Sequence, residues 1–198
     1  GDADAITKGF DQVIFPADRV CVSTTRSQLR LQTLPSADIV TWLLPGQGIP
    51  QDFSNLPLAD ADALEQWRLL QGWPASQELT GDTNPFELGL AKRISLSKGC
   101  YLGQETMAKL ASKGGVKQQL RFWRSAQPLN TGDPLSNGDD RAGLVTSVLE
   151  INNAEWMGLA LIRRSCLDAT SLQAGTVSLS LSKPLGFIDP PVGAGGQG

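Results

Sequence analysis

The feature that most constrains the fold is a series of short apolar segments in the second half of the chain. After Gly114-Gly115 come four segments in which apolar residues recur, "VKQQLRFW", "AGLVTSVLE", "WMGLALIRR" and "GTVSLSLS". Turn-forming runs separate them, among them Asn130-Thr131-Gly132-Asp133-Pro134 and Ser136-Asn137-Gly138-Asp139. Short strands at even spacing with such turns are typical of a small barrel or sandwich.

The first half of the chain mixes strand and helix signals. Residues 20–33 alternate apolar and polar side chains, which predicts a hairpin or two neighbouring strands. A third apolar run, "DIVTWLLPG", ends in a Pro-Gly turn. Together with the helices described next, these strands predict an α+β arrangement.

A helix is predicted over residues 59–71. Asp62-x-x-Glu65 resembles a capping box, and Gly72 followed by Pro74 would end the helix. One apolar face is expected at Leu64, Trp67 and Leu70. A long Pro- and Gly-rich loop follows, and loops of this length are often functional.

A strand, a turn and a second helix are predicted over residues 92–112. "AKRISLS" is typical of a short strand, "LGQETMAKLAS" contains strong helix formers, and Lys113-Gly114-Gly115 would end the helix. We therefore place the domain boundary there, with one domain over residues 1–114 and a β-domain over 115–189. The Gly-rich residues 190–198 are expected to form a disordered tail.

The composition excludes several kinds of chemistry. The chain has no histidine, which removes Ser-His-Asp and Cys-His catalysis and HExxH metal sites. Its three cysteines form no C-x-x-C pair, so no metal-ligand set is predicted and reduced thiols are expected. A net charge of −3 argues against a nucleic-acid partner, and no apolar run is long enough to cross a membrane. A cytoplasmic location is expected, or an organellar stroma or matrix in a eukaryote.

The segment "KGCYLGQE", residues 98–105, concentrates the most chemistry in the fewest residues. If it joins a strand to a helix, Cys100 lies just before a helix N-terminus, where unpaired N–H groups and Lys98 lower a thiol pKa. Gly99 and Gly103 allow close ligand approach, and the first helical turn holds Gln104 and Glu105. The alternative is a packed cysteine, because free Cys is among the most buried residue types. Packing is the favoured interpretation for Cys21 and Cys166.

Four basic residues lie between positions 113 and 124. Basic residues at alternating strand positions are expected either on a solvent-exposed face or against an acidic ligand such as a polyglutamate tail; they are Lys113, Lys117, Arg121 and Arg124. Glu65 and Arg68 are expected to form a solvated pair on the first helix. Trp73 is a candidate pocket wall.

With these residues in view, the chain resembles the folate-binding YgfZ family. The family motif K-G-C-[FY]-x-G-Q-E is matched at every position, that is, at Lys98, Gly99, Cys100, Tyr101, Gly103, Gln104 and Glu105. The flanks agree at Gly72-x-Pro74, Pro85-x-Glu87-x-Gly89-Leu90 and Gly115-x-x-x-x-Leu120. The family is related to the glycine-cleavage T-protein, an aminomethyltransferase, and includes a mitochondrial iron–sulfur assembly factor.

The resemblance implies a fold and a ligand. It implies an α+β, T-protein-like fold in which a mixed, partial folate-binding subdomain precedes a small C-terminal β-barrel. It also implies tetrahydrofolate or a derivative as ligand, at a site that this chain holds only in part. Candidate folate-cleft residues are Arg68, Trp73, Glu78 and Glu87.

Two departures from the aminomethyltransferases bear on activity. Those enzymes read D-F-x-G where this chain has Gly99-Cys100-Tyr101-Leu102-Gly103, so the thiol marks the branch outside glycine cleavage. They also carry a pterin-holding Glu at the position of Leu70, and a leucine accepts no hydrogen bond.

Three functions follow as hypotheses. The first is an accessory protein in iron–sulfur cluster assembly or repair that binds tetrahydrofolate, uses the Cys100 thiol, and has iron–sulfur proteins or assembly factors as clients. The second is a folate-dependent one-carbon transferase. The third is a binding module with a structural thiol. The absence of a complete catalytic set favours an accessory protein over an enzyme.

Overall fold

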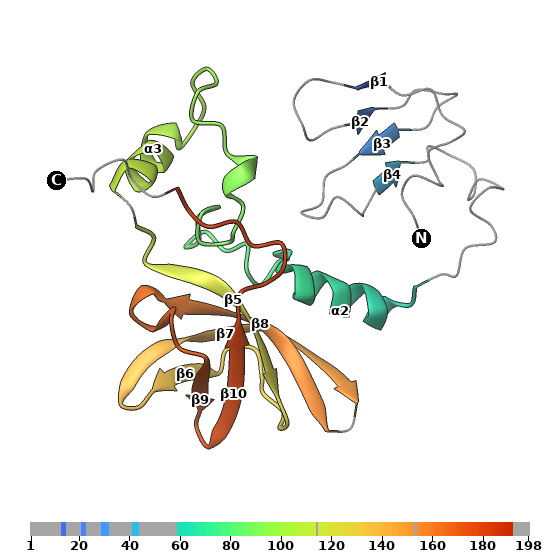
Figure 1. The fold of residues 1–198 in the computed structure, drawn as a ribbon, viewed down its shortest axis with the longest axis vertical. Helices are drawn as coiled ribbons and strands as arrows, with labels where there is room; N and C mark the ends of the chain where they lie inside the picture. The colour runs from blue at the N-terminus through green and yellow to red at the C-terminus, as the bar shows by residue number, and fades with distance from the viewer. Residues whose placement is uncertain are drawn as a thin grey trace. The chain divides into compact units, whose positions relative to one another are not determined.

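The structure, a computed structural model, describes residues 59–113, 115–152 and 154–191. It also gives the backbone of four short strands nearer the N-terminus, β1 (Val13–Ile14), β2 (Cys21–Val22), β3 (Leu29–Leu31) and β4 (Thr41–Leu43). The chain divides into two compact units, residues 1–59 and 60–198. In the first unit, β1 pairs with β2 and β3 with β4, both antiparallel (Figure 1). The two alternating runs predicted from the sequence thus belong to two separate two-stranded sheets.

The second unit is built around a closed antiparallel barrel of six strands in the order β10-β5-β8-β7-β6-β9 (Figure 1). Its strands are β5 (Gln118–Ser125), β6 (Pro134–Asn137), β7 (Asp140–Asn152), β8 (Glu155–Arg163), β9 (Ser171–Ala174) and β10 (Val177–Ser182). A short 3₁₀ helix, η3 (Arg164–Cys166), follows β8. The four strands predicted from sequence correspond to β5, β7, β8 and β10. The pattern missed β6 and β9, because four residues are too few to show an alternation.

Two apolar clusters lie on either side of the barrel wall. The cluster centred on Trp123 includes Leu135, Val145 and Leu179, and the Trp123 indole N–H donates to the Leu159 carbonyl at 3.1 Å. The second, outer cluster joins helix α2 to strands β5 and β8 and to the C-terminal segment; its buried members are Leu69, Leu120, Phe122, Met157, Leu159 and Phe187. The barrel is therefore covered on one side by residues that precede and follow it in the chain.

Helix α2 (Ala61–Gln71) forms at the expected place, but it begins and packs differently from the prediction. Its N-cap is Asp60 rather than Asp62, because the Asp60 carboxylate accepts a 2.7 Å hydrogen bond from the Ala63 N–H. Its buried residue is Leu69, whereas Leu64 is 57% exposed. The predicted apolar face is wrong at Leu64, whereas Leu70 packs against the outer cluster as expected.

Gly72 ends α2 and lets the chain pass close to the C-terminal segment. It has φ 66°, and a Cβ there would collide with Pro184. Beyond it, the Leu185 and Gly186 N–H groups donate to the Leu70 and Gln71 carbonyls at 3.0 and 3.1 Å. The end of α2 is thus hydrogen-bonded to the segment that follows the barrel.

The strand predicted in "AKRISLS" is absent. Residues Ala91–Arg93 form a 3₁₀ helix, η2, and the residues that follow bend. Only Leu90 makes a bridge here, to Ile188, and a strand cannot continue without a neighbour to pair with. Helix α3 (Gln104–Lys113) confirms the second predicted helix, and its Met107 and Ala111 pack on Phe86 and Val116.

The division into compact units differs from the boundary expected at residue 114. The barrel strands lie within the predicted 115–189 range, but residues 60–113 belong to the same compact unit as the barrel. The reason is the outer cluster, in which Leu69 of α2 packs with barrel residues. Of the predicted tail 190–198, residues from 192 onward lie outside the described part.

Candidate functional site

The KGCYLGQE segment forms a loop that leads into α3. Cys100 is a free, exposed cysteine four residues before the first residue of the helix. The helix starts at the turn expected, because the Met107 N–H donates to the Gly103 carbonyl at 3.0 Å and Gly103 has φ 85°. Gln104 and Glu105 occupy the first helical turn, as predicted.

Hydrogen bonds within the loop hold its shape. The Gln104 side-chain amide donates to the Lys98 carbonyl at 3.2 Å and to the Leu96 carbonyl at 3.4 Å. The Lys98 N–H donates to the Ser95 hydroxyl at 3.2 Å. The Gln104 side chain, at the start of α3, therefore holds the backbone that begins the Lys98–Gly103 turn. Its position in the motif alone did not reveal this role.

The side chains beside Cys100 differ in exposure. The Lys98 ammonium lies 4.9 Å from the centroid of the Tyr101 ring, while the Tyr101 hydroxyl is buried and has no hydrogen-bond partner among the described residues. Leu102, two residues after the thiol, is fully exposed. The loop thus presents the thiol and an apolar side chain to solvent, and it keeps the aromatic ring partly buried.

Arg68 joins two of the other candidate residues in a partly buried network. Its guanidinium donates to both Glu65 oxygens, at 2.7 and 2.6 Å, and to the Trp73 carbonyl at 2.8 Å. It also contacts the Glu78 carboxylate at 3.4 Å. The predicted pair of Glu65 and Arg68 is therefore present, but the Arg68 side chain is only 14% exposed, so the pair is partly buried rather than solvated.

Glu78 is fully buried at the centre of this network. One carboxylate oxygen accepts from the Ala75 N–H at 2.9 Å, and the other accepts from the Ser147 hydroxyl at 2.6 Å. Ser147 in turn accepts from Arg68 at 3.0 Å. No local sequence signal marks Ser147, which lies at a register shift in β7 and is 69 positions away from Glu78 in the chain.

The network shifts the pKa of two of its members. The hydrogen bond from Arg68, with its charge, lowers the pKa of Glu65 against the effect of burial. For Arg68, burial favours the neutral form, but the hydrogen bond and charge of Glu65 and the charge of Glu78 outweigh it and raise its pKa. Both groups are therefore held in their charged forms.

The Trp73 ring and Glu87 lie outside these side-chain contacts, although the Trp73 carbonyl accepts from Arg68. The Trp73 ring is stacked on Arg93, whose guanidinium carbon lies 5.5 Å from the ring centroid. Glu87 is buried; one oxygen accepts from the Asn84 N–H and the Gln118 amide, and the other has no hydrogen-bond partner among the described residues. Within the described part of residues 59–191, no hydrogen bond or ion pair joins Cys100 to Arg68, Glu78 or Glu87.

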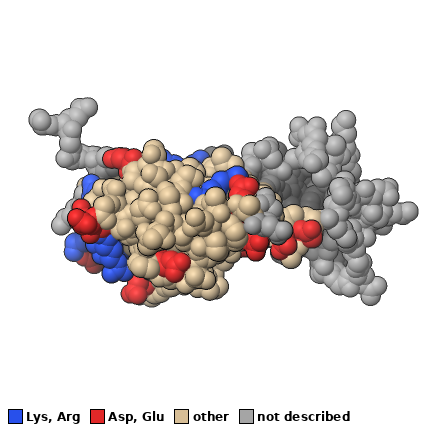
Figure 2. Space-filling view, turned by 90° about the horizontal axis from the view of Figure 1, so that it is seen from below, with Lys and Arg blue, Asp and Glu red and all other residues tan. Residues whose placement is uncertain are grey.

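The basic residues between positions 113 and 124 do not share one surface. Arg121 is 7% exposed and stacks on Phe187 at 5.2 Å, whereas Arg124 pairs with Glu155 at 2.8 Å on the surface. On the face shown in Figure 2, blue and red side chains are interspersed.

None of the described helices is long and apolar enough to cross a membrane. Nor does the described part contain a group of three Cys, Asp or Glu residues placed to hold a metal ion.

Comparison with known structures defines the class of fold. The glycine cleavage system aminomethyltransferase T from Bartonella henselae superposes on 66% of this chain and 39% of its own, with a TM-score of 0.52 and 19% sequence identity. At that identity the likeness concerns the fold alone. The chain therefore has a T-protein-like α+β fold with a C-terminal β-barrel.

Two curated proteins are similar to part of this chain in sequence. The chain is 38% identical over 104 residues to the Arabidopsis thaliana protein named "Putative transferase At1g60990, chloroplastic", covering 52% of this chain and 24% of that protein. It is 27% identical over 107 residues to the tRNA-modifying protein YgfZ of Blochmanniella pennsylvanica, covering 51% and 31%. The chain thus spans a quarter to a third of the length of these curated relatives. No family model matches it.

These similarities agree with the motif. The two sequence relatives support a YgfZ-like family for this chain, as the KGCYLGQE segment predicted, and the structural neighbour supports the T-protein-like fold.

Proposed function

We propose that this chain belongs to a tetrahydrofolate-binding accessory protein of iron–sulfur cluster assembly or repair, and that Cys100 is its working thiol. The observation that carries the proposal is the exposure of Cys100 in a loop braced by Gln104. A buried thiol would have favoured the structural alternative, because buried cysteines are inert. The T-protein-like fold and the complete motif support the folate part of the proposal.

The chemistry of a thiol suits such a role. A thiolate is a soft ligand that binds iron, and an exposed one is accessible to a second protein. Clusters usually take four protein ligands, so Cys100 would contribute one ligand and a client iron–sulfur protein or assembly factor would supply others. Cys100 therefore acts in a contact between proteins rather than in a resident cluster site.

The position of Leu70 favours an accessory role over a transferase. Leu70 packs against the outer apolar cluster of Leu69 and Phe187, where the related enzymes carry a pterin-holding glutamate. A hydrocarbon side chain gives the pterin no hydrogen bond. Tetrahydrofolate would then be bound without the carboxylate that the transfer reaction uses.

The test is complementation with the full-length protein. Cells that lack their own copy would receive the wild type, Cys100→Ser or the matched control Ser97→Ala, which changes an exposed hydroxyl in the same loop. The activity of an iron–sulfur dehydratase in extracts is the readout, and immunoblots confirm equal protein levels. We expect loss of activity with Cys100→Ser and normal activity with Ser97→Ala. Normal activity with Cys100→Ser would rule out the thiol as the working group.

The folate part is tested separately by calorimetry. Tetrahydrofolate titrated into the full-length protein should release or absorb heat with one saturable site. The absence of a saturable heat change, at tetrahydrofolate concentrations up to the millimolar range, would remove folate from the proposal while leaving the thiol hypothesis intact.

A further inference from the structure

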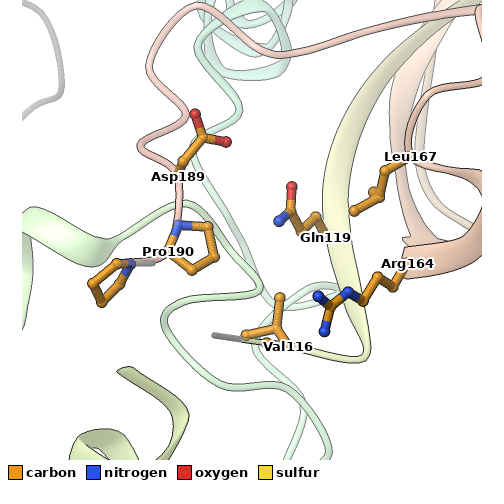
Figure 3. Close-up of a pocket in the computed structure, with 8 residues that line it drawn as sticks. Val116, Gln119, Arg164, Leu167, Asp189 and Pro190 are labelled. Atoms are coloured by element: carbon orange, nitrogen blue, oxygen red, sulfur yellow. The ribbon is translucent and has the colours of Figure 1, made fainter. Parts of the chain in front are cut away.

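A cavity lies at one end of the barrel, away from the residues proposed above. It has a volume of about 240 Å³ and lies between the start of β5, helix η3 and the segment at residues 189–191 (Figure 3). A cavity of about 150 Å³ holds a benzene molecule, so this one has room for a ring with one polar substituent. Part of its wall is apolar and is formed by Val116, Leu167, Pro190 and Pro191.

The polar part of the wall contains two hydrogen-bond donors, Arg164 and Gln119, and one carboxylate, Asp189. Arg164 lines the cavity, is exposed, and has no ion pair with any carboxylate in the described part of the chain. Figure 3 shows Arg164 and Gln119 on one side of the cavity and Asp189 and Pro190 on the other. The Gln119 amide nitrogen points toward Pro190, across the space. A guanidinium and an amide N–H₂ both donate hydrogen bonds, and here both could donate to a single bound ligand.

The orientation of Gln119 is fixed by a buried charge behind it. The Arg121 guanidinium donates to the Gln119 side-chain oxygen at 2.8 Å and to the Leu120 carbonyl at 3.0 Å. Because that oxygen is occupied, Gln119 presents its amide nitrogen to the cavity. Arg121 is more than nine-tenths buried and makes no ion pair with a described carboxylate.

The charges around the cavity leave a positive excess. Asp189 is the acidic residue that lines it, and both of its oxygens accept from the Lys183 ammonium, at 2.9 and 2.7 Å. The Lys183 ammonium thus compensates the charge of Asp189. In the described part of the chain, no carboxylate forms an ion pair with Arg121 or Arg164. Burial lowers the pKa of Arg121, and the charges of Asp189 and Asp168 oppose that effect.

We propose that this cavity is a binding site for a small monocarboxylate with an apolar body. The carboxylate accepts hydrogen bonds from the Arg164 guanidinium and the Gln119 amide, and the apolar body packs against Val116, Leu167 and the two prolines. Arg121 acts from behind the wall as a positioning residue for Gln119. The site is independent of Cys100 and of the function proposed for it.

The test uses benzoate as the probe and the full chain as the protein. Titrations are followed by the ¹H–¹⁵N amide shifts of Val116, Gln119, Arg164 and Leu167. Benzoate should move these signals saturably, whereas benzyl alcohol, which lacks the charge, and inorganic phosphate, which lacks the ring, should bind at least about tenfold more weakly. Equal binding of benzyl alcohol or of phosphate would overturn the assigned ligand class, and no saturable shift with benzoate in the millimolar range would overturn the site.

Two variants and one control locate the binding. Arg164→Ala should weaken benzoate binding at least about tenfold, because it removes charge-assisted hydrogen bonds. Gly115→Ala keeps the charge but places a Cβ against the Arg164 guanidinium, so it should weaken binding in the same direction. Arg163→Ala removes an exposed neighbouring charge outside the cavity lining and should leave binding unchanged. Unaltered affinity in both Arg164→Ala and Gly115→Ala would contradict the proposal.

Discussion

At the scale of single residues, two charged groups are held in place by one arginine. Arg68 contacts Glu65 near the surface and Glu78 in the interior, and Ser147 closes the network from the barrel. A buried carboxylate is tolerated only while its hydrogen bonds and counter-charge are present. Arg68 and Glu78 were candidates for a ligand cleft, but their contacts show that they also join α2, the following loop and the barrel.

Removing Arg68 should therefore destabilise the protein strongly. We expect Arg68→Ala to lower the free energy of unfolding by about 3 kcal/mol, because Glu78 would be left buried and without counter-charge. Adding Glu78→Gln to Arg68→Ala should restore part of the loss. Urea unfolding followed by circular dichroism measures both effects.

The control for this prediction is the exposed pair of Arg124 and Glu155. Their side chains are 45% and 39% exposed, so Arg124→Ala should cost less than about 1 kcal/mol. If Arg68→Ala were as mild as Arg124→Ala, the network would not contribute to stability.

At the scale of elements, helix α2 is positioned by the barrel rather than by its own pattern. Leu69 is completely buried in the outer cluster, and backbone hydrogen bonds join the end of the helix to residues 185 and 186. Most of the stability of a helix of this length comes from tertiary packing. The contacts of α2 with the barrel strands therefore decide which side of the helix is buried.

A pair of leucine substitutions tests this packing. Leu69→Ala should lower the free energy of unfolding by about 2–5 kcal/mol, because it opens a cavity between α2 and the barrel. Leu64→Ala, at a position 57% exposed, should change it by less than about 0.5 kcal/mol. Thermal or urea unfolding measures both variants, and the opposite order would support the face predicted from the sequence.

At the scale of the whole molecule, the barrel and the segment before it form one compact unit. The division at residues 59 and 60 leaves α2, the Pro- and Gly-rich loop and α3 with the barrel. Strands β5 and β8 carry apolar residues on the side that α2 covers, namely Leu120, Phe122, Met157 and Leu159. A barrel without residues 60–114 would expose this surface to water.

Two fragments distinguish the boundary seen here from the one expected at residue 114. A fragment of residues 60–198 should fold, with the dispersed amide spectrum of a packed barrel. A fragment of residues 115–198 should aggregate or unfold at lower urea concentration, because its outer apolar cluster has lost Leu69. Equal stability of the two fragments would show that the barrel needs no cover.

The sequence by itself determined the features that depend on local patterns. Alternation predicted the four longer barrel strands, start and stop signals with an apolar period predicted α2, and helix formers predicted α3. The motif placed Cys100 just before a helix. The four-residue strands β6 and β9 gave no such pattern, and the strand expected near Ile94 had no neighbour to pair with.

Only the tertiary structure decided how distant residues meet. It brought Ser147 to Glu78 across 69 positions, buried Arg121 behind Gln119, and turned Leu69 rather than Leu64 toward the barrel. The physical reason is that periodicity records the secondary structure a segment can form, whereas contacts between segments depend on register, bulges and barrel closure, which no local window contains. The thiol of Cys100 could be found from the sequence, but its exposure could not.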